Sequence, residues 1–180
     1  VIMDKFGEFF EITDAVNDVG VPHEMFPALT SDEVMLNMIE AYIMKKDYDK
    51  ALTNFNIWMH NFTSYTKNVT MDDINRVYGE YQEDELTGES TGMKYYTPTE
   101  PTPKKELHPD FTVEKGDQEN FLQCLLHCRR IMTLHEGLRW FDIKRYGMTI
   151  YRRTIDGSGD ITVTDTMNVD DPRRAIQLPA

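Results

Sequence analysis

The chain of 180 residues has few cysteines, few basic residues and no long apolar run. No segment approaches the roughly 20 consecutive apolar residues that a membrane-spanning helix needs. Cys124 and Cys128 are four residues apart, a spacing that makes a disulfide within one helix awkward, so we expect free thiols that fill core space. Together with His135 they would supply three zinc ligands at most, and paired C-x-x-C motifs are missing. We therefore expect no metal and no cofactor.

The scarcity of basic residues restricts the partners. Nineteen lysines and arginines face 31 acidic residues, for a net charge of −12. The imbalance lies before residue 129, whereas residues 129–180 hold 7 acidic and 9 basic residues. An acidic surface argues against nucleic acid, whose binding depends on basic groups meeting phosphates, and against direct binding to an anionic membrane. A neutral ligand such as a sugar is compatible with this charge.

What the chain does contain is helical periodicity. Residues 31–62 predict a helical pair, with Thr30 or Ser31 as N-cap, a break at Lys46 and Asp47, and the small Ala51 where two helices can approach closely. This pair resembles one tetratricopeptide repeat, although no second copy follows. Before it, residues 1–18 read as an extended, partly buried piece that ends in a turn at residues 17–20.

Residues 63–118 form an irregular insert. Residues 72–78 predict a short helix capped by Thr70, and the prolines of residues 97–103 favour extended backbone. A loop of this length inside a domain is usually functional or disordered. Tyr95 and Tyr96 are the local candidates for ligand binding because their rings offer flat faces to sugars. The alternative is that they only fix the loop to the helices.

Residues 119–147 predict further helices, with a restart at Gly137. Arg139, Asp142 and Arg145 are spaced by three, which predicts one carboxylate between two guanidinium groups in a core-docking element. The alternative reading makes Glu136 and Asp142 a carboxylate pair for hydrolysis; we favour the structural role. Residues 151–155 and 160–164 flank a turn and predict a β-hairpin within the segment 148–180.

Three runs carry a resemblance to a known family: R-R-I at residues 129–131, L-H-E-G-L-R-W-F-D-I-K-R-Y-G at residues 134–147, and D-P-R-R-A-I-Q-L-P at residues 171–179. They resemble the C-terminal signature of the SusD/RagB family of nutrient-binding outer-membrane lipoproteins of Bacteroidetes. The resemblance implies a single domain over residues 1–180, the C-terminal portion of a longer protein. It also implies a mainly α fold of tetratricopeptide-like helical pairs with long irregular loops, a small β-hairpin and an extended tail. The residues to which the family's structural role is carried over are Arg130, Glu136, Gly137, Arg139, Trp140, Phe141, Asp142 and Arg145.

The resemblance also implies a function. Members bind glycans or other nutrients without catalysis and act with a TonB-dependent outer-membrane transporter in oligosaccharide uptake. It implies a surface-exposed lipoprotein of the outer membrane, held by a lipid anchor that lies before residue 1. Family members bind glycans largely through variable loops outside the matched runs, so no binding residue is carried over from them. The alternative function is a tetratricopeptide-like scaffold for protein–protein interaction.

Overall fold

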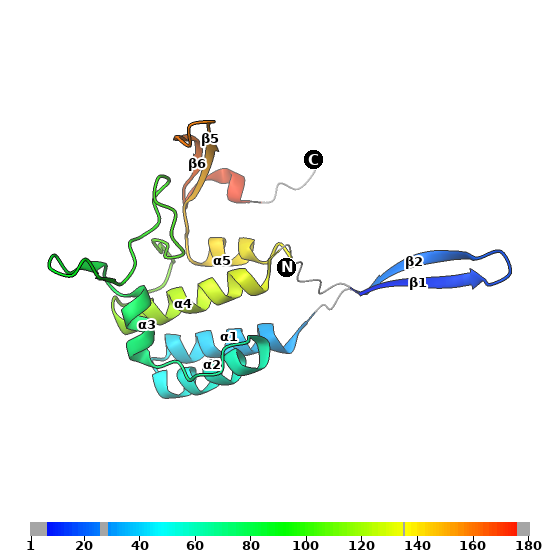
Figure 1. Ribbon diagram of the computed structural model, residues 1–180, viewed down its shortest axis with the longest axis horizontal. Helices are drawn as coiled ribbons and strands as arrows, with labels where there is room; N and C mark the ends of the chain where they lie inside the picture. Colours follow the sequence, from blue (N-terminus) through cyan, green and yellow to red (C-terminus); the bar gives the residue numbers. More distant parts are fainter. Residues whose placement is uncertain (1–6, 26–28, 135, 176–180) are drawn as a thin grey trace.

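A computed structural model of the protein describes residues 7–25, 29–134 and 136–175. In these residues the chain forms five α-helices and three two-stranded antiparallel sheets. Figure 1 shows α2, α1, α4 and α5 lying one above another, with the β5–β6 hairpin beyond α5 and α3 across one end. The β5–β6 hairpin, which belongs to the slightly basic segment 129–180, therefore lies on one side of the helices.

The predicted helical pair is present as α1 (Ser31–Met44) and α2 (Tyr48–Phe62). The chain reverses between them at Lys46, whose φ of +59° is left-handed. The two helices contact each other, and Leu36 and Ile39 of α1 and Ala51 of α2 are fully buried. Because alanine adds only a methyl group, the two helices approach closely at this position.

The insert contains the predicted short helix, α3 (Met71–Tyr78). The hydroxyl of Thr70 accepts a hydrogen bond from the Asp73 backbone N–H (3.2 Å), and the Asp73 carboxylate accepts one from the Thr70 N–H (3.1 Å). This reciprocal capping box satisfies two backbone donors that a helix start leaves unpaired. Two short strands, β3 (Gln82–Glu83) and β4 (Ser90–Thr91), follow, and most of the remaining insert is irregular.

The core forms where α4 (Asp117–Met132) packs on α1 and α3. Phe121 of α4 meets Phe55 of α2 edge to face, with ring centroids 5.5 Å apart. Both rings are almost fully buried. Burying each such side chain contributes about 1.5–3 kcal/mol, so this contact is a main source of stability. The helix α5 (Arg139–Arg145) contacts α4.

The predicted C-terminal hairpin is confirmed as β5 (Ile150–Ile155) paired with β6 (Ile161–Met167). The buried Arg174 fixes its base by donating to the carbonyl oxygens of Asn168 (2.5 Å), Met167 (3.2 Å) and Met148. The prediction of an extended tail is wrong at Pro172–Arg174, which form a 3-10 turn. Residues 176–179 of the predicted tail lie outside the described residues.

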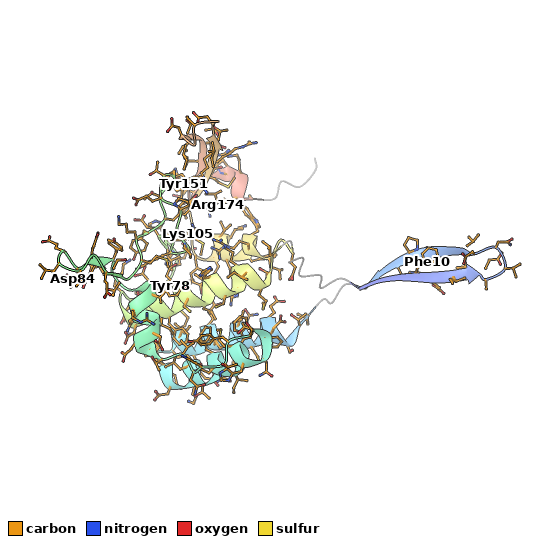
Figure 2. All side chains as sticks on the ribbon, viewed as in Figure 1. Phe10, Tyr78, Asp84, Lys105, Tyr151 and Arg174 are labelled. Atoms are coloured by element: carbon orange, nitrogen blue, oxygen red, sulfur yellow. The ribbon has the colours of Figure 1, made fainter. Side chains whose placement is uncertain are left out.

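At the other end, β1 (Gly7–Asp14) and β2 (Val19–Met25) form an antiparallel hairpin that stands apart from the helices in Figure 1. The extended backbone and the turn were predicted, but the returning strand was not. The expected partial burial is wrong for Phe10 and Ile12, whose side chains are 61% and 55% exposed. Figure 2 shows Phe10 on this hairpin, remote from the other labelled residues.

The predicted fold class, a mainly α domain of tetratricopeptide-like pairs, is wrong. The described residues combine five helices with three small sheets, so the domain mixes α and β structure. Among the described helices, α1 and α2 alone form the predicted kind of pair, and its partner in the core is the long α4, with α3 packed on α4. The physical reason is that a single helical pair cannot bury its own apolar face, and here one long helix from later in the chain covers it.

Candidate ligand-binding site

The most highly charged buried region lies where α1, α4 and α5 meet. The carboxylate of Glu40 accepts hydrogen bonds from Arg129 (2.7 Å), Arg145 (2.8 Å) and the Tyr146 hydroxyl (2.5 Å). Asp142 accepts from Arg129 (2.9 Å) and Arg139 (3.3 Å). Burial favours the neutral form of Glu40, but the charge of Arg129 and these hydrogen bonds outweigh it and keep its pKa below the ordinary value.

This network corrects the predicted arginine stripe. Asp142 pairs with Arg139 as expected, but its second partner is Arg129 of α4, and Arg145 pairs with Glu40 of α1. The spacing of three indicates which side of α5 the groups share, but it cannot identify a partner 105 residues away. Both oxygens of Asp142 are engaged by guanidinium groups, an arrangement that suits a structural ion pair better than a catalytic acid.

The other residues of the predicted structural motif are distributed over this corner. Gly137 has a φ of +76°, which glycine adopts readily, and it separates α4 from α5 as predicted. Trp140 is half-buried, whereas the side chain of Phe141 is 67% exposed, which does not fit a core-docking role for that residue. The half-buried Glu136 lies in the turn, where its backbone N–H donates to the Thr133 carbonyl (3.1 Å). Arg130 is exposed and lines a different cavity from the one above the network.

A cleft of about 690 Å³ lies over this network between α1 and α5, with Phe141 and Leu138 among its lining residues. Its buried carboxylates, Glu40 and Asp142, are already paired with arginines. A ligand that reached these two carboxylates would have to displace ion pairs within the protein. The charged groups of the lining without a described ion pair are Glu33 and Lys45, at the rim of the cleft rather than in the buried network.

Tyr95 and Tyr96 do not form one platform. The Tyr95 hydroxyl donates to Glu119 (2.8 Å) and accepts from Lys115 (2.7 Å), and its ring lines a cavity of about 400 Å³ beside α4. Tyr96 lines a different cavity and stacks on Tyr151 of β5, with ring centroids 6.0 Å apart and planes 17° apart. Neighbouring side chains of an extended backbone point in opposite directions, so consecutive tyrosines were unlikely partners for one ligand.

The cavity beside Tyr96 is about 280 Å³ in volume and joins four parts of the chain. The insert supplies Tyr96 and Lys105, and β5 supplies Tyr151 and Arg153. Figure 2 shows Lys105 and Tyr151 in the region between α4 and the β5–β6 hairpin. Arg130 of α4 and Arg139 of α5 complete its charged lining. We call this the tyrosine–arginine cavity.

Local contacts hold the insert in this position. The Tyr96 backbone N–H donates to the Lys104 carbonyl (2.7 Å), which closes the proline-rich loop on itself. The Lys105 backbone exchanges two hydrogen bonds with the buried side chain of Gln123 in α4 (3.0 and 2.5 Å). These bonds to a rigid helix fix where Tyr96 and Lys105 project.

The electrostatics of the tyrosine–arginine cavity centre on Lys105. Its ammonium group donates to the Thr102 carbonyl (2.9 Å) and lies 3.1 Å from the centroid of the Tyr96 ring. Burial, and then the nearby charges of Arg130, Arg139 and Arg153, lower the pKa of Lys105 to about 7. Sequence reasoning missed Lys105, Tyr151 and Arg153. The excess of basic residues after residue 128 was an available signal for Arg153, and the sequence held none for the other two.

The cysteines lie elsewhere in the core. Cys124 is buried, Cys128 is half-buried and both thiols are free. The hydrogen bond to Cys128 and then burial raise the pKa of the Cys124 thiol, which leaves it a poor nucleophile at neutral pH. His135, the third residue of the zinc alternative, lies outside the described residues. No group of three or more metal-binding side chains occurs in the part of the chain that is described.

Comparison of the chain with family models, curated proteins and solved structures gives no match. The resemblance to the SusD/RagB family therefore rests on the three sequence runs. Among the described helices, none is both long and apolar enough to cross a membrane.

Proposed function

We propose that the protein captures an oligosaccharide without catalysing a reaction on it, and that it acts beside a TonB-dependent outer-membrane transporter. The observation that carries the proposal is the stacked pair Tyr96–Tyr151 in a cavity rich in hydrogen-bond donors. The order-specific resemblance to the SusD/RagB family supports it. By that resemblance, the site of action is the cell surface, where a lipid anchor would hold the protein on the outer membrane.

The tyrosine–arginine cavity has the features that a sugar ring requires. The nearly parallel rings of Tyr96 and Tyr151 form an aromatic wall against which the apolar C–H groups of a sugar can pack. The side chains of Arg130 and Arg153 carry donors for sugar hydroxyls. Ligand cavities usually hold roughly 300–1,000 Å³, so a volume of about 280 Å³ suits one short part of a glycan.

A non-catalytic role agrees with the state of the carboxylates. Glycoside hydrolysis needs two carboxyl groups on either side of the scissile bond, one of them able to donate a proton. Asp142 is engaged by two arginines and Glu40 by two arginines and a tyrosine. We do not propose the alternative of a tetratricopeptide-like scaffold, because such scaffolds stack several repeats and the described residues contain one helical pair.

The test is a glycan array followed by titration calorimetry with the best ligand. Tyr151→Ala should weaken binding about two- to tenfold, as expected for one lost aromatic contact. The matched control is Tyr65→Ala, because Tyr65 is 45% exposed and does not line this cavity. Circular dichroism of each variant verifies that the fold is intact.

Two results would overturn the proposal. One is the absence of binding to any oligosaccharide on the array. The other is release of reducing sugar ends when the protein is incubated with its ligand, which would make it an enzyme. Equal weakening by Tyr151→Ala and Tyr65→Ala would leave the function standing but move the site away from the tyrosine–arginine cavity.

A further inference from the structure

The tyrosine–arginine cavity concentrates positive charge in an acidic protein. Its charged lining residues are Lys105, Arg130, Arg139 and Arg153, and no carboxylate lines it. The chain as a whole has 31 acidic and 19 basic residues. Four cations that meet in one cavity of such a chain form a local field opposite in sign to the net charge.

Three of these four cations lack a carboxylate partner within the described residues. Arg139 pairs with Asp142 (3.3 Å), but Arg153 donates to the Pro98 carbonyl (3.1 Å) and Lys105 to the Thr102 carbonyl. Arg130 makes no ion pair with any residue that the structure describes. The charges of Lys105, Arg130 and Arg153 therefore repel one another, and no ion pair with a described carboxylate offsets this repulsion.

The neighbouring carboxylate of Glu106 does not neutralise these cations. Glu106 lines a small adjoining cavity of about 30 Å³ together with Lys105 and Tyr151. Its side chain is 68% exposed and lies 3.7 Å from His108. Because Glu106 is exposed to water, its attraction for the cations of the tyrosine–arginine cavity is weak.

We propose that the tyrosine–arginine cavity binds the carboxylate of an acidic sugar, with Tyr96 and Tyr151 against the ring and Arg130 and Arg153 at the acid group. This inference rests on the proposed function and narrows its ligand class to oligosaccharides that contain a uronic acid. Guanidinium groups suit carboxylates because their planar N–H donors match two oxygens at once. The proposed ligand is anionic, whereas the net charge of the chain favours a neutral one.

Binding of an acidic sugar should be coupled to protonation of Lys105. The groups that face it are Arg130, Arg139 and Arg153, with Glu106 in the adjoining cavity, and its pKa of about 7 leaves it partly neutral at neutral pH. An anion placed among these cations favours the charged ammonium group. Binding of an acidic sugar should therefore draw a proton from the buffer.

The experiment compares trigalacturonate with its methyl ester, which has the same ring structure but no charge. Calorimetry should show the acid binding about tenfold tighter or more at low salt, with the difference shrinking as salt is added. Arg130→Gln should remove most of the preference. The matched control is Arg152→Gln, which removes the same charge from an exposed neighbour of Arg153 that does not line the cavity. Repeating the titration in two buffers of different ionisation enthalpy measures the proton uptake.

The other possible results distinguish a failure of the acidic-sugar inference from a failure of the proposed function. If the ester or a neutral glycan binds as tightly as the acid, the oligosaccharide function stands and the acidic-sugar inference is wrong. If no glycan binds at all, the proposed function fails. Inorganic sulfate then serves as a probe: binding that Arg130→Gln abolishes would define an anion site that does not recognise sugars, which also overturns the inference.

Discussion

Replacing Glu40 with glutamine tests the buried charge network most directly. Glutamine keeps the size of the side chain but removes the charge that Arg129, Arg145 and Tyr146 surround. Arg129 keeps Asp142, whereas Arg145 loses its carboxylate. Removing one partner of a buried ion pair costs about 3–5 kcal/mol. At roughly 2–4 °C per kcal/mol for a chain of this size, Tm should fall by roughly 6–20 °C.

The assay is urea unfolding at neutral pH, followed by circular dichroism. The matched control is Glu33→Gln, the same change in the first turn of the same helix, where no ion pair to a described residue is lost. Its cost is the interaction with the helix dipole, about 1 kcal/mol at most. Equal unfolding free energies for the two variants would show that the network does not stabilise the fold.

The decrease in unfolding free energy at acidic pH tests the ionisation of Glu40 independently. Glu40 has a pKa below its ordinary value of 4.5 in the folded protein. The folded state therefore holds this proton less tightly than the unfolded state. The resulting stability is fully present above about pH 4.5 and is lost as pH falls through the folded pKa. The difference in unfolding free energy between wild type and Glu40→Gln should shrink as pH is lowered; a constant difference would contradict the assigned ionisation.

Three further changes probe local features by urea unfolding. Thr70→Ala breaks the capping box of α3 and should cost about 1 kcal/mol, whereas Thr70→Ser should cost less. Ala51→Leu overfills the fully buried contact between α1 and α2 and should cost about 1–3 kcal/mol. Burial, and then Arg130 and Arg139, hold the pKa of His127 below its ordinary 6.5. The stability that this depressed pKa supplies is present above pH 6.5 and lost below, so His127→Phe should flatten the pH dependence of unfolding between about pH 7 and 5.

Elements with local signals were predictable from the sequence. The α1–α2 pair, the capped α3 and the β5–β6 hairpin are each specified by caps, periodicity or turn residues a few positions apart. The β1–β2 hairpin had such a signal too, because the Asp14 side chain accepts hydrogen bonds from the N–H groups of Val16 and Asn17 in its turn. Pro22 hid the returning strand, since proline is rare inside sheets. Two-stranded ribbons tolerate it because one side of each strand has no neighbour.

The candidate site was predictable only in part. Tyr96 was among the proposed ligand residues, but its partner Tyr151 lies 55 positions later and in another element. Pairings of this kind depend on how β5 and the insert pack on α4, which no local pattern encodes. The same holds for Arg145, whose helical spacing pointed to Asp142 although tertiary packing brings it to Glu40.

Net charge was the weakest guide to the ligand. A value of −12 averages over a surface on which charges farther apart than about 8–10 Å are largely screened at physiological salt. A ligand in the tyrosine–arginine cavity responds to the groups that line it, and these are cationic. The acidic remainder of the surface still matters, because it repels polyanions on approach and so disfavours long, densely charged chains. The two fields together favour a short acidic oligosaccharide over a long polyanion.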